Sequence, residues 1–229
     1  MKKLIVLSGA GMSAESGIMT FRDMGGLWEQ YNIEEVASPV AWKHSPQLVL
    51  DFYNQRRKQL MEVQPNKGHF AIFELEKYFD VQIITQNVDN LHERAGSTKV
   101  LHLHGELMKV RSEVNENLVY EMDNWELKLG DKAEDGQQLR PHIVWFGEAV
   151  PMIEKAIPIV QSADIIVIVG TSMQVYPAAS LISYSNPEAE LYYIDPNADA
   201  YSYPNLKCIN RKATDGLQEL ALLLRNKDY

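Results

Sequence analysis

Two groups of polar residues follow short apolar runs and could act on a bound ligand. His104 and Gly105 end one such run, and an imidazole can take up a proton near neutral pH, which makes His104 a candidate general base. Asn87 and Asp89 lie two apart after the run 81–85, so an extended backbone would aim both side chains the same way. An amide and a carboxylate there could hold a carboxamide. From the residues alone the alternatives stay open: a structural histidine, and a pair that caps a helix starting near Leu91.

A glycine turn directly follows the first apolar run. Gly9 and Gly11 lie where a strand would turn into a helix, so that backbone amides could approach a pyrophosphate. The same spacing also serves as a plain tight connection. Ala14 stands where the dinucleotide-binding pattern G-x-G-x-x-G has its third glycine, and no acidic residue ends a strand about 20 residues later. An ordinary hydride-transfer enzyme is therefore disfavoured.

The elements that would position these residues alternate along the chain. Apolar, β-branched runs predict strands over 3–8, 81–85, 100–103, 143–146, 164–169, 191–194 and 206–210. Helical patterns fill the gaps at 46–63, 69–78, 152–161, 178–185 and 213–225. This alternation predicts an α/β fold, a Rossmann-like doubly wound parallel sheet whose strand ends gather the candidate residues.

Two stretches interrupt the alternation. Residues 19–43 predict a loop with short helical pieces, and the polar, acidic residues 106–140 predict a small inserted lobe rather than sheet. We therefore expect a single domain over 1–229. Its large part would comprise about 1–18, 64–105 and 141–229, with small-lobe insertions at about 19–63 and 106–140.

Composition excludes several classes of protein. Lys and Arg number 22 against 31 Asp and Glu, a net charge of −9, which disfavours a nucleic-acid binder because a phosphate backbone rewards a basic surface. No apolar window approaches the roughly 20 residues of a membrane-spanning helix. The single cysteine, Cys208, excludes an internal disulfide and a cysteine-rich zinc cluster, and we expect it to be buried as a small apolar residue in a cytoplasmic protein.

Five motifs along the chain resemble those of the sirtuins, the Sir2-like NAD-dependent protein deacylases. They are, in chain order, Gly9-Ala10-Gly11 continuing to Phe21-Arg22, Gln86-Asn87-x-Asp89, His102-x-His104-Gly105, Arg140-Pro141 continuing to Phe146-Gly147-Glu148, and Gly170-Thr171-Ser172. The resemblance implies that NAD is the co-substrate and that the substrates are acylated lysines of proteins or peptides.

The resemblance also assigns roles to single residues. It implies that His104 and Asn87 are catalytic, with His104 as the base. The residues implied to contact NAD are Gly9, Ala10, Gly11, Ser13, Ala14, Ser16, Phe21, Arg22, Gln86, Asn87, Asp89, His104, Gly170, Thr171, Ser172, Asp195, Asn197 and Ala213. Which of Asp195 and Asn197 holds the adenosine ribose stays open. The residues implied to pair with the substrate backbone as an added strand are Val144, Trp145, Phe146, Gly147 and Glu148.

The implied reaction moves an acyl group from lysine to ADP-ribose. The acyl-lysine carbonyl oxygen attacks the nicotinamide ribose and nicotinamide leaves, after which His104 deprotonates a ribose hydroxyl that attacks the acyl carbon. The products are free lysine, nicotinamide and O-acyl-ADP-ribose. Two alternatives use the same scaffold: an NAD glycohydrolase or ADP-ribosyltransferase, and a non-catalytic sensor of NAD or ADP-ribose.

One departure from the family lies in the predicted lobe. Most sirtuins carry a zinc ribbon of four cysteines between the catalytic histidine and the substrate strand, and this chain has no cysteine there. Since thiolates dominate structural zinc sites, we expect no zinc. The lobe would then be held by its own packing, around Leu118, Tyr120, Trp125 and Leu129.

Tyr53 and Arg56 lie three apart in an expected helix and so share one of its faces. A guanidinium and a phenol together could bind a carboxylate. The alternative is that Arg56, Arg57 and Lys58 are solvated charges on a surface helix. The pair resembles the Tyr-x-x-Arg of class III sirtuins, which include bacterial deacetylase-desuccinylases, and the resemblance implies removal of succinyl and malonyl groups as well as acetyl.

Overall fold

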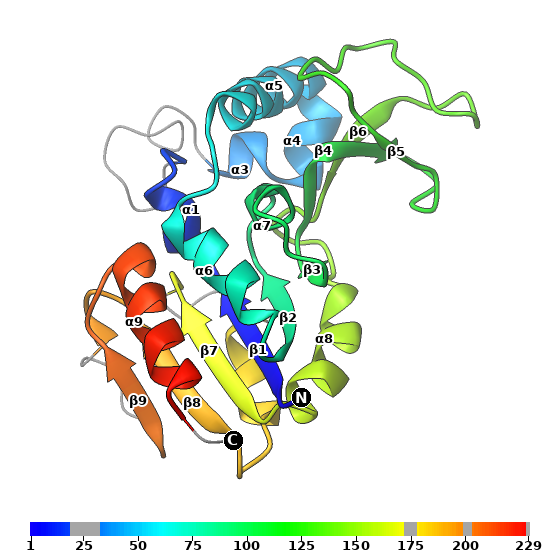
Figure 1. Ribbon diagram of the computed structural model, residues 1–229. Coiled ribbons are helices and arrows are strands. Elements are labelled where there is room, and N and C mark those ends of the chain that lie inside the picture. The colour runs from blue at the N-terminus through cyan, green and yellow to red at the C-terminus, as the bar shows by residue number, and fades with distance from the viewer. Residues whose placement is uncertain (19–32, 172–177, 199–202, 228–229) are drawn as a thin grey trace.

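The computed structural model describes residues 1–18, 33–171, 178–198 and 203–227, and all structural statements concern these residues. The larger of two sheets is parallel throughout (Figure 1). Its strands, in spatial order, are β3 (Val100–His102), β2 (Asp80–Thr85), β1 (Lys3–Ser8), β7 (Ile165–Val169), β8 (Glu190–Ile194) and β9 (Leu206–Ile209). The order reverses between β1 and β7, which is the point where doubly wound sheets bind ligands. The predicted Rossmann-like fold is confirmed.

Helices cover both faces of this sheet (Figure 1). On one face α6 (Lys67–Leu75) and α9 (Ala213–Arg225) contribute to an apolar core, and on the other α8 (Met152–Gln161) and the 3-10 helix η1 (Ala178–Tyr184) do so. All five residues of β7 are buried, as expected for a strand covered on both faces. Two short helices, α1 (Gly11–Ala14) and α7 (Leu91–Arg94), follow β1 and β2.

The helix α6 begins two residues before the predicted start because Asn66 caps it. The Asn66 side chain accepts hydrogen bonds from the N–H groups of Gly68 (2.9 Å) and His69 (3.4 Å). In return, the Asn66 N–H donates to Nδ1 of His69 at 3.2 Å. This reciprocal pair satisfies amides that an uncapped helix leaves without partners.

A second unit, called here the small lobe, combines residues 33–62 and 105–143 (Figure 1). It holds α3 (Ile33–Val36), α4 (Pro39–His44) and α5 (Pro46–Glu62) beside an antiparallel sheet in the order β5 (Val119–Glu121), β4 (Gly105–Ser112), β6 (Leu139–Ile143). Ser38 caps α4 through its hydroxyl, which accepts from the Ala41 N–H at 3.0 Å. The proposed division of the chain stays a prediction, and β6 crosses its boundary at residues 140 and 141.

The expectation that residues 106–140 form no sheet is wrong. A register shift between Gly105 and Val110 interrupts the pairing of β4 with β6, so Leu107 and Val110 are buried three residues apart. Such a bulge removes the strict alternation by which a strand is recognised in a sequence.

Two packing expectations are also wrong. The core of the small sheet is Leu50, Val110 and Leu127, with Tyr120 packed against it, whereas Trp125 and Leu129 are 36% and 47% exposed. Cys208 is exposed, because it lies on β9 at the edge of the large sheet. Among the described residues, no helix has the length and apolar character needed to cross a bilayer.

Candidate active site

The turns after β1, β2 and β7 meet at one edge of the large sheet. Ser8 at the end of β1 pairs with both Thr85 and Val169, so these three strands end at the same level. The Gln86 N–H donates to the Ser8 carbonyl at 2.9 Å, and its side-chain amide reaches the Thr171 hydroxyl at 3.4 Å. The predicted gathering of the first, second and last motifs therefore has a simple cause in strand register.

The glycines of this edge allow two turns to touch. A Cβ atom on Gly9 would lie 2.6 Å from Cβ of Thr171. Gly170 has φ +63°, and a Cβ there would lie 2.2 Å from the Met12 nitrogen. Only glycine permits such an approach at that dihedral angle. The turn after β7 is thus packed directly against the turn after β1 and the start of α1.

A chain of buried hydrogen bonds links the first two turns. The Asn87 side-chain amide donates to the Ser13 hydroxyl at 3.1 Å, and that hydroxyl donates to Asp89 at 2.9 Å. The other oxygen of Asp89 accepts from the Leu91 N–H at 3.1 Å, so Asp89 also holds the start of α7. Burial raises the pKa of Asp89. The capping role and the turn-to-turn role coexist in one carboxylate.

The two histidines of the third motif have different surroundings. His102 is bonded through both ring nitrogens, Nδ1 with the Asn87 carbonyl and Nε2 with the Glu93 carboxylate, each at 2.8 Å. Burial acts against its charged form, yet the hydrogen bond and charge of Glu93 raise the pKa of His102. His102 therefore fixes the backbone that carries Asn87.

His104 is half-buried and donates from Nδ1 to the Gln86 carbonyl at 3.0 Å. Because a carbonyl only accepts, the hydrogen lies on Nδ1 and the lone pair of the neutral ring lies on Nε2. Burial lowers the pKa of His104. The ring is thus held in the tautomer that a general base requires.

The segment after β6 does not continue as the predicted strand. The strand ends at Ile143, after which the Val144 N–H donates to the His104 carbonyl at 2.9 Å and the Phe146 N–H to that of Ala37 at 3.0 Å. Gly147 has φ +90°, and Phe146 is 53% exposed. The expected strand over 143–146 is wrong, because these backbone amides turn to partners within the chain.

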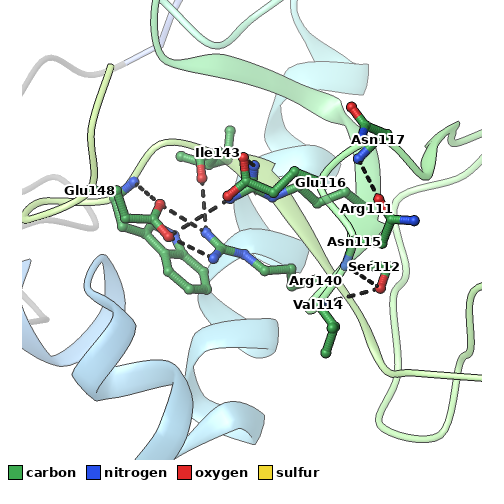
Figure 2. Close-up of polar contacts among 10 residues, drawn as sticks. Arg111, Ser112, Val114, Asn115, Glu116, Asn117, Arg140, Ile143 and Glu148 are labelled. Carbon is green, nitrogen blue, oxygen red and sulfur yellow. Dashed lines mark hydrogen bonds and ion pairs between the residues drawn. The ribbon is translucent and has the colours of Figure 1, made fainter. Parts of the chain in front are cut away.

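Glu148 holds this segment from inside. Its carboxylate accepts from Nη1 and Nη2 of Arg140 at 2.7 and 3.1 Å and from the Trp145 N–H at 2.7 Å. Figure 2 shows Arg140 between Glu148 and the Ile143 carbonyl, to which it donates at 3.0 Å, with Arg111 beside them. Glu148, whose backbone is predicted to pair with the substrate, therefore fixes with its carboxylate the turn that carries Trp145 and Phe146.

Tyr53 and Arg56 lie on α5, on the small-lobe side of the site. Tyr53 is buried, and its hydroxyl accepts from the indole N–H of Trp145 at 3.0 Å. Burial raises the pKa of Tyr53 to about 12. Arg56 is half-buried; burial lowers its pKa, and the charges of Tyr53 and Asp89 act in the opposite direction. Arg56 thus lies within electrostatic reach of the edge that carries Asp89.

The far end of the edge lies between β8 and α9. Asp195 accepts from the Asn197 N–H at 2.8 Å, so the two candidate ribose ligands share one turn. Ala213 starts α9 and is buried. The Glu15 carboxylate accepts from the N–H and the hydroxyl of Thr214, at 3.0 and 2.8 Å, and so ties α9 to the first turn.

The family follows from comparison with known proteins. A sequence model of the Sir2 family matches residues 9–177. The chain belongs to the Sir2 family. A protein of Helicobacter pylori named NAD-dependent protein deacylase is 61% identical over 221 residues, which cover 96% of either chain. A protein of the same name from Bacteroides thetaiotaomicron is 56% identical over 230 residues, 98% of either chain. A crystal structure of a Sir2 homologue in complex with NAD is 39% identical, with a TM-score of 0.86 over 98% of this chain and 90% of that one.

The edge of this Sir2-family chain fits NAD in the chemistry of its donors and acceptors. Oδ1 of Asn90 is buried and has no hydrogen-bond partner among the described residues, so it is available to a donor such as a ribose hydroxyl or a carboxamide. Phe21, Arg22 and Ser172, which the resemblance also assigns to NAD, lie outside the described residues.

Sequence reasoning missed two residues that organise the Sir2-family site. Arg140 and Glu148 belong to one motif, but their bond was not predicted, and their separation of eight residues was the one sign in the sequence. Asn66 donates to the Met12 carbonyl at 2.8 Å and to the Ser16 hydroxyl at 3.0 Å, and its position at a helix start was the only sign. In the described ranges no group of three His, Cys, Asp or Glu side chains could hold a metal; the zinc-free lobe stays a prediction.

Proposed function

We propose that this chain deacylates protein lysines at the edge formed by β1, β2, β3 and β7, with His104 as general base, and that it removes succinyl and malonyl as well as acetyl groups. NAD-dependent protein deacylation is the activity of this Sir2-family chain, since relatives 56% and 61% identical over nearly their whole length carry that name. The proposal adds to that activity the roles of single residues and the range of acyl groups.

The tautomer of His104 supports its role. With the hydrogen held on Nδ1 by the Gln86 carbonyl, Nε2 can take the proton of a ribose hydroxyl. The lowered pKa keeps the ring neutral, and therefore basic, at neutral pH. NAD supplies the ribose that receives the acyl group, one water molecule is consumed as the lysine amine leaves, and the products are nicotinamide, O-acyl-ADP-ribose and free lysine.

The buried hydrogen-bond chain supports the roles of the NAD ligands. Ser13, Asn87 and Asp89 would hold the carboxamide and the nicotinamide ribose, because their polar atoms are already fixed against one another. The touching turns at Gly9, Gly11 and Gly170 would bind the pyrophosphate, and Asp195 or Asn197 the adenosine ribose.

The observation that carries the acyl range is the position of Arg56. Its half-buried guanidinium shares one face of α5 with Tyr53, whose hydroxyl is bonded to Trp145 in the substrate segment. A desolvated arginine beside a phenol favours an acyl chain that ends in a carboxylate. A succinyl or malonyl group would bring a carboxylate to this charge, whereas an acetyl group would bring none.

The test compares acetyl-lysine and succinyl-lysine peptides of one sequence with the unmodified chain, Arg56→Met and Gln55→Met. The last is a matched control, because Gln55 is the exposed neighbour on the same helix. We expect Arg56→Met to lose kcat/KM for the succinyl peptide by ~2 to 5 kcal/mol in transition-state stabilisation, while deacetylation stays within a few-fold. Equal losses on the two peptides would assign Arg56 to the scaffold and refute the acyl range.

A further inference from the structure

Trp145 is fixed on three sides in the substrate segment. Its side chain is 2% exposed, and its ring centroid lies 3.4 Å from Cζ of Arg140. The Glu148 carboxylate accepts from the Trp145 N–H at 2.7 Å. It also accepts from the Arg140 guanidinium, and Figure 2 shows these two side chains facing each other. The ring of Trp42 packs against the indole with centroids 5.8 Å apart. A cation held against an indole face in a buried site is strongly oriented, so the direction of the indole N–H is set by the substrate segment.

The indole N–H determines what the Tyr53 hydroxyl can do. An indole only donates, so the phenol oxygen must be the acceptor in the 3.0 Å contact between them. The phenol keeps its own proton to donate. Within the part of the chain that the structure describes, no acceptor takes that proton, although Tyr53 is buried. A buried hydroxyl in this state favours a ligand that brings an acceptor.

We infer that Trp145 is a specificity-determining positioning residue, which commits the Tyr53 hydroxyl to donating toward the acyl group and so favours acyl chains that end in a hydrogen-bond acceptor. This rests on the proposed function, in which Tyr53 and Arg56 meet the distal end of the acyl chain. Trp145 acts through Tyr53 and need not touch the acyl carboxylate itself. Without its N–H, the phenol would be able to turn or to donate elsewhere.

The test is a double-mutant cycle of Trp145→Phe and Tyr53→Phe, read as the ratio of kcat/KM for succinyl-lysine to that for acetyl-lysine. We expect Trp145→Phe to lower this ratio about five- to tenfold, the range of one hydrogen bond, and Tyr53→Phe at least as much. In the Tyr53→Phe background, Trp145→Phe should leave the ratio unchanged. A role through packing alone would act equally in both backgrounds.

Trp42→Phe is the matched control, because it alters the ring packed on Trp145 while its own N–H bonds Glu113 at the surface at 3.0 Å. Its ratio should stay that of the unmodified chain. If Trp145→Phe does not fold, a benzothiophene analogue of tryptophan placed at position 145 removes the N–H and keeps the ring, and the same fall in ratio is expected.

Two results would overturn the inference, and they differ from failure of the proposed function. An unchanged ratio in Trp145→Phe or the analogue, with desuccinylation intact in the unmodified chain, would refute the inference alone. An equal fall in the presence and absence of the Tyr53 hydroxyl would refute it too. An unmodified chain that removes acetyl but not succinyl groups would refute the proposed acyl range, and this inference with it.

Discussion

The large part and the small lobe differ in how far each depends on buried charged side chains. The large sheet packs continuous apolar runs between helices, and its two cores consist of aliphatic and aromatic side chains. The small lobe has two apolar clusters of its own, one around α5 and one under its sheet, and it also contains two buried arginines, Arg57 and Arg140. Burial of apolar area tolerates many sequences, whereas a buried charge is stable only when its hydrogen bonds are made. The region that meets the acyl group is therefore the one that depends on single polar contacts.

Arg57 shows how the small lobe is assembled. It is fully buried and donates to the Leu107 carbonyl at 2.9 Å, the Trp125 carbonyl at 3.1 Å and Oδ1 of Asn54 at 2.6 Å. Asn54 in turn binds both the N–H and the carbonyl of Leu127, at 2.9 and 3.0 Å. These two side chains of α5 hold the segment in which most sirtuins place their ribbon cysteines.

The largest expected effect is on catalysis, because we assign the general base to the large part of the molecule. His104→Ala should reduce deacylation of acetyl and succinyl peptides by about a thousandfold or more, since it removes the general base. NAD binding should change little, because the pyrophosphate turn does not depend on this ring. Turnover and NAD affinity by calorimetry check both statements. Undiminished turnover would remove His104 from the catalytic role.

In the small lobe the largest effect on stability should come from Arg57→Met. The carbonyls of Leu107 and Trp125 lose the donor that Arg57 supplies, whereas the Asn54 oxygen keeps the Leu127 N–H. At about 1 to 3 kcal/mol for each buried carbonyl left without its donor, we expect the free energy of unfolding to fall by about 4 kcal/mol. The matched control is Lys58→Met on the same helix, where an exposed side chain should change stability by less than ~0.5 kcal/mol. Denaturant titration decides, and equal small effects would mean that the arginine is dispensable.

Acid should weaken the large part through its buried histidines. The rings of His69 and His92 pack edge to face with centroids 4.9 Å apart. Burial lowers the pKa of His69 to about 4 and that of His92 well below its usual value. Because the pKa of a histidine in the unfolded chain is about 6.5, the unfolded chain takes up these protons at a higher pH than the folded chain does. The contribution of the two neutral histidines to the free energy of unfolding is therefore present above about pH 6.5 and is lost as the pH falls toward 4. His69 alone would contribute a loss of about 3 kcal/mol.

The contribution of His69 is measured by comparing the free energy of unfolding of the unmodified chain with that of His69→Gln between pH 7.5 and 4. The variant should show a flatter pH dependence over the same interval. If both proteins lose stability in parallel, the histidine pair is not the source.

Metal removal should have the smallest effect. Because the small lobe is held by Asn54 and Arg57 rather than by thiolates, a chelator should leave the melting temperature unchanged, and purified protein should contain less than one zinc per chain. One tightly held zinc per chain, with unfolding of the small lobe on its removal, would reverse the comparison between the two regions.

The difference between the large part and the small lobe also explains why the first was predicted from the sequence better than the second. The central strands β1 and β7 of the large sheet are continuous apolar runs. The convergence of Asn87, Asp89 and His104 follows from parallel strands that end together. The sheet of the small lobe was not recognised in the sequence because a bulge breaks the alternation of apolar and polar residues in β4. Arg57 looked like a solvated charge because its carbonyl partners lie 50 and 68 residues further along the chain. The Trp145–Tyr53 bond spans 92 residues and has no local sign.

The most direct test of the whole account is the fate of the acyl group. The protein is mixed with NAD and a succinyl- or acetyl-lysine peptide, and the products are separated, identified and quantified by mass spectrometry. We predict O-succinyl- or O-acetyl-ADP-ribose, nicotinamide and free lysine peptide in equal amounts. Free ADP-ribose beside a peptide that keeps its acyl group, or ADP-ribose attached to the peptide, would contradict deacylation, and no release of nicotinamide would contradict catalysis altogether.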